Sequence, residues 1–373
     1  MRTLSVLAAL LAVPTLASAQ AAPLPTPAPA PGSDLLRVSV DSGKKEVLLL
    51  SGPFDIAGSG GGGHVHHEHE MEYPVIRFTW PTDGWLRGFR LEVTDGDGNP
   101  IDRRLIHHLN VVNFGRRQLF YPAVERTLAV GQETGDITLP ATIGVPISAG
   151  TPMGLVVAWH NEKPEPIIDV MVRLTLIWSP TNQMPRPKDV IFVYADVLYP
   201  IGRNANFDLP AGSSSFTREF QMPVSGRVLG AGGHLHDYGR EIRFERLGAG
   251  GRGAGSGDRE DAETIIRLPA KSDQSGRLAE IGRSLPGLWG QGIRLRAGEH
   301  YRLIGTYFNP TGEAITEGAM VHLAMMFAPD RLSDWPALDP SDPDTQKDLA
   351  FLAARGSKRG EHQHAEGEAE HQH

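Results

Sequence analysis

Short strand-like runs of hydrophobic residues recur along most of the chain, with turns rich in glycine, proline and aspartate between them. The first clear runs are Pro-Val-Ile-Arg-Phe-Thr-Trp at 74–80 and Leu-Arg-Gly-Phe-Arg-Leu-Glu-Val at 86–93. Further strands are expected at 154–160, 170–178, 240–246, 301–307 and 320–328. This spacing of short strands and turns is typical of β-sandwiches and barrels, so we expect an all-β fold.

A proline-rich polar segment at 180–188 divides the strand-rich part of the chain. It predicts a linker between two β domains of roughly equal size, at 35–180 and 188–332. Residues 333–373 form a tail in which 341–355 favour one short helix after an Asp/Pro start. The polar His/Glu-rich end of this tail is expected to be disordered.

The beginning of the chain is typical of a secretory signal peptide at 1–19. Arg2 precedes a short apolar run, and Ala-Ser-Ala at 17–19 matches a cleavage site. A Pro/Ala-rich segment at 20–34 then reads as an extended linker. We therefore expect an exported chain, periplasmic or secreted.

Composition excludes several classes of partner and stabilising device. The chain has no cysteine, so an exported protein of this kind must rely on its hydrophobic cores and on bound metal rather than on disulfides. Its net charge is −8 and it has no basic clusters, which argues against nucleic acid as a partner. No segment reaches about 18 consecutive apolar residues, so no membrane span is predicted.

His234 and His236 are the most informative pair in the sequence. They stand two residues apart in Gly-Gly-His-Leu-His-Asp-Tyr-Gly, and residues i and i+2 of a strand point to the same face. Two imidazoles about 7 Å apart at Cβ can close on one metal ion. Met320 offers a thioether further along, and imidazole together with thioether favours copper, although a methionine in an apolar strand is most often a core residue.

A second set of imidazoles lies in the first predicted domain. His107 and His108 are adjacent, so on a flat strand they point to opposite faces; both can bind one ion only if the strand is twisted, bulged or at an edge. The alternative is one core histidine and one surface histidine. His160 ends an apolar strand, where a lone histidine is usually an ordinary polar residue, and the three together would make a His₃ site suited to copper or zinc.

Other histidines are candidates for weak, accessory metal binding. His322 shares a strand face with Met320. A loop after four glycines carries four more histidines, and the end of the chain carries another four: His64, His66, His67 and His69, then His362, His364, His371 and His373. Such tracts are typical of flexible metal-scavenging segments, but they also fit ordinary solvated loops.

The order His-His, His, His-x-His and Met resembles that of the copper type II, ascorbate-dependent monooxygenases, which include peptidylglycine α-hydroxylating monooxygenase and dopamine β-monooxygenase. The matching pieces surround His107, His108, His160, the pair His234 and His236, and Met320, and the likeness covers most of 70–330. The stretch Val-Leu-Tyr-Pro-Ile at 197–201 is similar to the family's entry into its second domain.

This resemblance implies two tandem eight-stranded jelly-roll domains with one copper ion in each. It implies that His107, His108 and His160 hold an electron-transfer copper, and that His234, His236 and Met320 hold the copper where dioxygen reacts. A small reductant such as ascorbate, or a periplasmic electron donor, would then be the co-substrate.

Two positions depart from the peptide-hydroxylating members of that family. Where they carry an arginine two residues before the His-x-His pair, this chain has Gly232. Where they carry a tyrosine four residues after the methionine, it has Ala324. Because both residues help to hold a substrate carboxylate in those enzymes, peptidylglycine is not the expected substrate, and the substrate stays open between a small molecule and another peptide.

The sequence leaves three functions to weigh. The first is a copper-dependent monooxygenase that hydroxylates a C–H bond. The second is a non-catalytic exported protein that binds, buffers or delivers copper on the same scaffold. The third is a cupin that uses His234, His236 and Glu241 for iron or manganese, although it leaves the other candidate ligands unused. A serine or cysteine hydrolase and a phosphate-loop enzyme have no matching motif.

Overall fold

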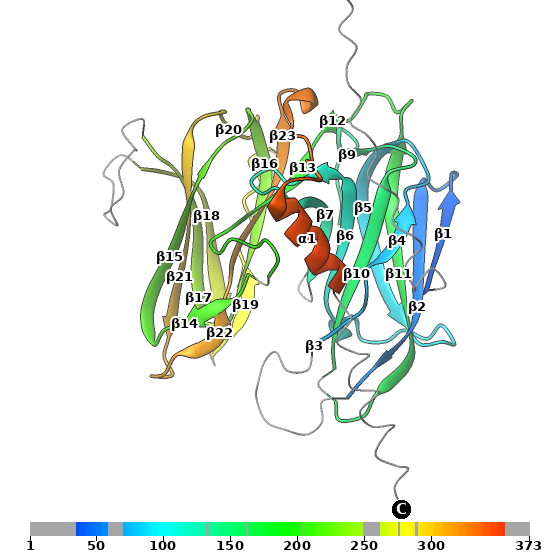
Figure 1. The fold of residues 1–373 in the computed structure, drawn as a ribbon, viewed down its shortest axis with the longest axis horizontal. Coiled ribbons are helices and arrows are strands. Elements are labelled where there is room, and N and C mark those ends of the chain that lie inside the picture. Colours follow the sequence, from blue (N-terminus) through cyan, green and yellow to red (C-terminus); the bar gives the residue numbers. More distant parts are fainter. Residues whose placement is uncertain are drawn as a thin grey trace, which may run out of the picture.

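The computed structural model describes residues 35–58, 70–131, 134–161, 163–203, 205–248, 262–274, 277–287 and 290–354. The predicted signal peptide at 1–19, the predicted Pro/Ala linker at 20–34, the histidines at 64–69 and the histidines after 354 lie outside these residues. Nearly all regular structure within them is β, which confirms the predicted all-β fold. Figure 1 shows two β-sandwiches side by side, with the helix α1 (Pro343–Ala354) lying across the front between them.

The first sandwich has the strand order of a jelly roll. One sheet has the order β1-β2-β11-β5-β9-β12, with β8 beside β5; the other has the order β3-β10-β6-β7, with β4 beside β10. Its central strands therefore interleave early and late segments, as two Greek keys require. The strands are β1 (Leu36–Asp41), β2 (Glu46–Ile56), β3 (Glu70–Glu72), β4 (Ile76–Thr79), β5 (Gly84–Thr94), β6 (Ile106–Arg117), β7 (Val124–Gly131), β8 (Ile137–Thr138), β9 (Ile143–Ile147), β10 (Pro152–His160), β11 (Ile167–Pro180) and β12 (Lys188–Asp189).

The second sandwich repeats this topology. One sheet has the order β13-β23-β16-β20, the opposing sheet has the order β15-β21-β17-β18-β19, and β14 pairs with β22. The strands are β13 (Ile191–Asp196), β14 (Phe207–Leu209), β15 (Gly212–Gln221), β16 (Gly226–Leu235), β17 (Gly239–Arg246), β18 (Glu263–Ser272), β19 (Leu278–Ile281), β20 (Ile293–Leu295), β21 (His300–Asn309), β22 (Ile315–Ala319) and β23 (Val321–Pro329). The chain thus forms two tandem jelly-roll sandwiches, as expected.

Alternation along the strands builds one core inside each sandwich. Phe54 and Trp159 meet in the first core, with ring centroids 5.3 Å apart. Phe244 and Tyr301 stack in the second core at 5.4 Å. Because burial of such large side chains is the main favourable term in folding, these cores are the main source of stability in a chain that has no cysteine.

The two sandwiches also share buried surface. Leu229, Met326 and Ala328 belong to the second sandwich but pack into the hydrophobic cluster of the first. All three lie on the sheet β13-β23-β16-β20, on the side opposite to the second core. Part of this outer face is therefore an interface between the sandwiches.

Helix α1 is fastened to the first sandwich by a buried carboxylate. Asp348 accepts hydrogen bonds from the backbone N–H of Val124 at 3.0 Å and from both terminal nitrogens of Arg126 at 2.7 Å. Leu352 packs with Val112 and the apolar residues around it on the outer face of the sheet of β6 and β10. The helix expected at 341–355 is therefore present, and it covers one part of that face.

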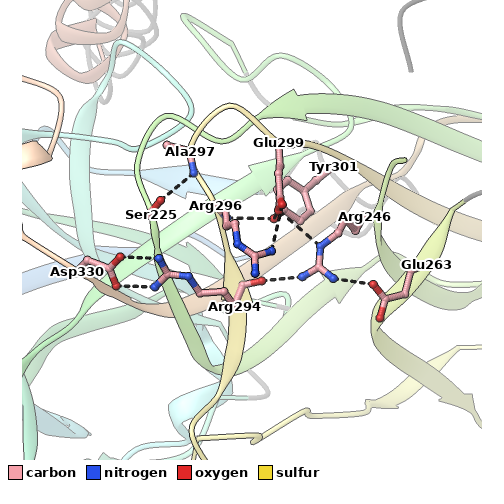
Figure 2. Close-up of polar contacts among 9 residues, drawn as sticks. All are labelled: Ser225, Arg246, Glu263, Arg294, Arg296, Ala297, Glu299, Tyr301 and Asp330. Carbon is pink, nitrogen blue, oxygen red and sulfur yellow. Dashed lines mark hydrogen bonds and ion pairs between the residues drawn. The ribbon is translucent and has the colours of Figure 1, made fainter. Parts of the chain in front are cut away.

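An ionic network closes the end of the second sandwich where β21 begins (Figure 2). Arg294 forms a bidentate ion pair with Asp330, with both N–O distances 2.6 Å, and Arg246 forms an ion pair with Glu263 at 2.6 Å. The hydroxyl of Tyr301 donates to Glu299 at 2.6 Å.

No helix among the described residues is long and apolar enough to cross a membrane.

Candidate metal centres

A β-bulge places His107 and His108 on one face of their sheet. Ala158 of β10 pairs with His108, but the next residue, Trp159, pairs with Ile106, so that His107 is an extra residue in β6. Ile106 and Leu109 both point into the first core although they are three residues apart. The extra residue therefore turns both histidines to the outer face, which meets the condition that the sequence set for a shared ion.

The distance between the two imidazoles matches shared coordination. Their Nδ1 atoms lie 3.3 Å apart, a separation at which one ring donates a hydrogen bond to the other in the absence of an ion. Two nitrogens bound to one tetrahedral ion at about 2.0–2.1 Å lie roughly 3.3 Å from each other. The distance between the Nδ1 atoms of His107 and His108 therefore equals the distance between two ligands of one tetrahedral ion.

His160 joins this pair from the end of β10. Its strand neighbours Val157 and Trp159 point into the core, so His160 points to the same outer face as the bulged histidines. The ring centroids of His107 and His160 are 6.3 Å apart. Rings that share one tetrahedral ion through nitrogens at about 2.0–2.1 Å have centroids roughly 5.2 Å apart, so the ring of His160 would have to move closer to bind the same ion.

Asn161 fixes the backbone where the chain leaves β10. This residue is 2 % exposed, and its amide group donates to the backbone carbonyls of Ala57 at 3.1 Å and Glu165 at 2.9 Å. A satisfied, buried amide directly after His160 holds the end of the strand in place. We call His107, His108 and His160 the first cluster.

The second cluster forms where β16 and β23 run side by side. Leu235 pairs with Val321 and both point into the second core, so the residues that flank them point outward. His234 lies directly opposite His322, and continuing the same register by one residue sets His236 opposite Met320. Four half-buried side chains therefore share one face, and the rings of His234 and His236 are 5.4 Å apart at their centroids. We call His234, His236 and Met320 the second cluster.

The hydroxyl of Tyr307 ties the two strands of this cluster together. It accepts hydrogen bonds from the backbone N–H of His236 at 3.3 Å and of Met320 at 3.1 Å, and it donates to the carbonyl of Met320. A hydroxyl has one donor and two acceptor positions, so all three are used. Burial raises the pKa of Tyr307, so the hydroxyl keeps its proton. Sequence reasoning missed this residue, because it lies 71 and 13 positions from the two segments that it joins.

His322 is oriented by a buried carboxylate that the sequence did not single out. Its Nδ1 is 2.7 Å from Oδ1 of Asp196, which lies opposite it on β13 and is 4 % exposed. The backbone N–H of Asp196 bonds in turn to the hydroxyl of Tyr121 at 2.7 Å. The ring of Tyr194, also on β13, lies 5.0 Å from the imidazole at 30°. This is the arrangement by which carboxylates fix the tautomer and direction of functional histidines.

Both clusters lie on the faces that the sandwiches turn toward each other. Figure 1 shows β13, β16 and β23 on the side of the second sandwich next to β6, β7 and β10. On the first sandwich, apolar residues under α1 give way to the half-buried histidines near the start of β6. On the second, the part of the face around Leu229 and Met326 is buried against the first sandwich, whereas the cluster occupies the half-buried part.

The donor chemistry of both clusters fits copper. Imidazole nitrogen binds both oxidation states of copper, and a soft thioether favours Cu(I). Among the described residues, no group of three or more His, Asp or Glu side chains is already arranged around a point where an ion could sit. Side-chain rotations would therefore be needed for three imidazoles to converge, while the Nδ1 atoms of His107 and His108 are already at a distance that fits a shared ion. This finding concerns only His, Asp and Glu, so it does not cover Met320, the third member of the second cluster.

Glu241, which the cupin alternative needs as a metal ligand, is paired with arginines on the opposing sheet. It lies on β17 in the opposing sheet, its carboxylate bonds Arg267, and it forms a further ion pair with Arg243 at 3.1 Å. His234 and His236 face away from that sheet. The geometry therefore gives the cupin alternative no support.

Comparison with known proteins adds no family. No protein-family model matches the chain, and no curated protein matches it. Solved structures with a similar arrangement include the major capsid protein P2 of bacteriophage PM2, with 9% identity and a TM-score of 0.31 over 70% of this chain and 98% of that one. They also include PNGase F, a glycosylasparaginase from Flavobacterium meningosepticum, with 10% identity and a TM-score of 0.30 over 75% and 96%. These scores are too low to support an inference about what this chain does.

Proposed function

We propose that this chain is an exported copper-dependent monooxygenase that hydroxylates a C–H bond of an organic molecule with dioxygen and a small reductant such as ascorbate. The observation that supports it is the placement of two ligand sets, drawn from distant segments, on the faces that the sandwiches turn toward each other. His107, His108 and His160 would hold one copper ion, and His234, His236 and Met320 the other.

The two clusters suit different tasks. Three imidazoles bind Cu(I) and Cu(II) alike, which suits electron transfer at the first cluster. At the second cluster the thioether would favour the reduced ion, and His234, His236 and Met320 would leave room for a further ligand on it. Bound copper supplies the one-electron and dioxygen chemistry, while the protein holds the ligands in place through Tyr307 and Asn161.

The reaction balances with reagents of defined class. One oxygen atom of O₂ is inserted into the C–H bond of the substrate, and the other leaves as water. Two electrons come from the reductant and two protons from solvent. Ascorbate meets this need because it gives up electrons one at a time, which matches one-electron metal centres.

Metal content measured on full-length variants tests the two sites. His108→Ala and Met320→Ala are each expected to lower the copper content of the full-length protein by one ion per chain. His300→Ala removes an imidazole outside both clusters and is the matched control, with no change expected. Because each variant is compared with the unmodified chain, copper on the histidine loop and tail cancels. Unchanged copper content in both cluster variants would refute the metal sites.

Oxygen uptake tests turnover and distinguishes the leading function from the alternative. The copper-loaded chain is expected to consume oxygen when ascorbate is added, and Met320→Ala is expected to abolish this uptake while the first cluster keeps its ion. A copper-binding or delivery protein would lose copper in the same variant but show no reductant-dependent uptake that depends on Met320.

A further inference from the structure

Strand β1 (Leu36–Asp41) is the open edge of the larger sheet of the first sandwich. Among the described residues it pairs with β2 alone, over six residues and without a shift in register. An edge strand leaves the backbone N–H and C=O groups of every second residue unpaired, so it can accept a further strand. Figure 1 shows β1 on the outer flank of the molecule, where the second sandwich does not cover it.

The inner side of β1 is apolar and only partly covered. Val38 lies opposite Leu49, and Val40 lies opposite Val47. Both partners belong to the first core, so the two valines point to the inner side of the sheet. They are nevertheless 37 % and 41 % exposed, because the sandwich ends at this strand. A further strand beside β1 would cover them.

The edge strand β15 carries a protection that β1 lacks. Arg218 of β15 lies opposite Leu303 of the second core, so its side chain points to the inner side of the sheet. Its guanidinium lies 4.8 Å from the ring of Tyr199. An inward-pointing charge at an edge strand deters pairing with another chain. The inner side of β1 has valines at the corresponding positions.

The outer side of β1 has a charge at each end. Asp41 lies directly opposite Glu46, and like charges in this position are unfavourable. Glu46 is paired with Arg90 at 2.7 Å, whereas Asp41 has an ion pair of 3.8 Å with the exposed Lys44. Arg37 has no carboxylate partner among the described residues. The strand therefore carries an unpaired cation at one end and a weakly balanced carboxylate at the other.

A second copy of β1 fits this edge in one antiparallel register. Directly opposite residues must turn their backbone groups the same way, so an odd-numbered residue faces an odd-numbered one. With Ser39 of one copy opposite Ser39 of the other, Arg37 lies opposite Asp41 and Val38 lies opposite Val40, each twice. Strands that pair in this way are about 4.8 Å apart, within reach of an arginine side chain. A shift of two residues in either direction loses both charge pairs.

We infer that this chain forms a two-fold symmetric homodimer through β1, in which Arg37 of each copy pairs with Asp41 of the other and Val38 packs beside Val40. The same surface serves both partners, as a two-fold interface requires. Each cross-strand pair contributes modestly, so the dimer is reversible. This inference does not rest on the proposed function, because β1 lies on the flank away from the faces that carry the two clusters.

Sedimentation equilibrium of the full chain over a range of concentrations tests the dimer. The unmodified chain is expected to pass from monomer to dimer as its concentration rises. Arg37→Asp places two carboxylates opposite each other in both charge pairs and should weaken the dimer at least about tenfold. Arg240→Asp is the matched control, since it makes the same charge change at an exposed arginine of β17 and should leave the dimer unchanged.

A mixture of two variants tests which residues meet. Arg37→Asp and Asp41→Arg should each stay monomeric alone, and the mixture should dimerise, because each carboxylate of one chain then meets an arginine of the other. Circular dichroism confirms that each variant is folded, which is needed because Asp41 also accepts a hydrogen bond from the backbone N–H of Lys44 at 2.9 Å. A mixture of folded variants that stays monomeric would contradict the pairing.

A single introduced thiol tests the register. The chain has no cysteine, so Ser39→Cys carries one thiol, which should form a disulfide-linked dimer under mild oxidation because the two copies of residue 39 face each other. Ser213→Cys, at an exposed serine of β15, is the matched control and should not cross-link.

Two results would overturn the inference. One is a chain that stays monomeric at every concentration. The other is a dimer that Arg37→Asp leaves unchanged, since another surface would then form it. Copper content is measured separately, so either result leaves the metal sites standing.

Discussion

Replacing Tyr307 with phenylalanine removes one oxygen atom and tests whether a buried hydroxyl positions the second cluster. The ring stays in the second core, where Tyr307 is 2 % exposed. The three hydrogen bonds that join the hydroxyl to the backbone of His236 and Met320 are lost. The change therefore loosens the link between the two strands without creating a large cavity.

Its magnitude follows from the bonds removed. Each net hydrogen bond contributes about 0.5–1.5 kcal/mol, and water can reach part of the half-buried backbone, so we expect a loss of about 2 kcal/mol in the free energy of unfolding. Groups that orient metal ligands typically change metal affinity by about 10- to 100-fold. Affinity for Cu(I) at the second cluster should fall within that range.

The assay combines urea unfolding with competition for Cu(I) against a coloured chelator. Tyr301→Phe is the matched control, since its hydroxyl also lies in the second core and bonds Glu299 at 2.6 Å and the backbone N–H of Arg296 at 3.2 Å. Tyr301 stands six residues before Tyr307 on the same strand, about 20 Å away, within the network of Figure 2. Tyr301→Phe is expected to lower stability but to leave Cu(I) affinity unchanged.

Equal Cu(I) affinity in Tyr307→Phe and the unmodified chain would refute the reasoning. The hydroxyl would then stabilise the sandwich, as that of Tyr301 does, without setting the position of the ligands. A fall in Cu(I) affinity in both variants would also refute it, because the effect would then follow general stability rather than the local bonds.

Two further predictions concern buried carboxylates, Glu125 of the first sandwich and Asp348 of helix α1. Burial raises the pKa of Glu125 above its usual 4.5 despite Arg116 beside it, so its stabilising contribution is present below about pH 4.5 and is lost as pH rises through the folded-state pKa. As pH is raised from about 4 to about 7, the free energy of unfolding of Glu125→Gln should therefore increase relative to that of the unmodified chain, measured by urea unfolding. A difference that does not change with pH would contradict this. Asp348→Ala removes the carboxylate partner of the half-buried Arg126, which keeps only its bond to the carbonyl of Val124, and leaves the N–H of Val124 unpaired; it is expected to cost about 3 kcal/mol. Chymotrypsin should then cleave α1 after Phe351 sooner than in the unmodified chain, and an unchanged cleavage rate would show that other contacts hold the helix.

The sequence predicted the strands that carry strong hydrophobic runs. The run expected at 154–160 is β10 (Pro152–His160), and the run at 320–328 is β23 (Val321–Pro329), because side chains of these strands fill the cores. β15 (Gly212–Gln221) was not predicted, since its serine-rich sequence buries only one position fully and it pairs on one side only, with β21. An edge strand needs little hydrophobic surface, so its sequence resembles that of a loop.

Local spacing also identified the side chains that could bind metal, but not how they meet. The pair His234 and His236 follows from the two-residue period of a strand, which is a local property. The bulge that turns His107 and His108 to one face depends on how β6 pairs with β10, and the position of Met320 opposite His236 depends on the register of β16 and β23. Strand register is set by long-range packing and cannot be read from one segment.

What the chain by itself determined is an all-β fold and a set of candidate metal ligands, because hydrophobic period and side-chain chemistry belong to each segment alone. Only the tertiary structure decided which buried polar groups hydrogen-bond to these residues and orient them. Tyr307 beneath His236 and Met320, and Asp196 behind His322 at a separation of 126 residues, are joined by hydrogen bonds across strands. Such bonds depend on the folded positions of distant backbone groups, so no local pattern in the sequence records them.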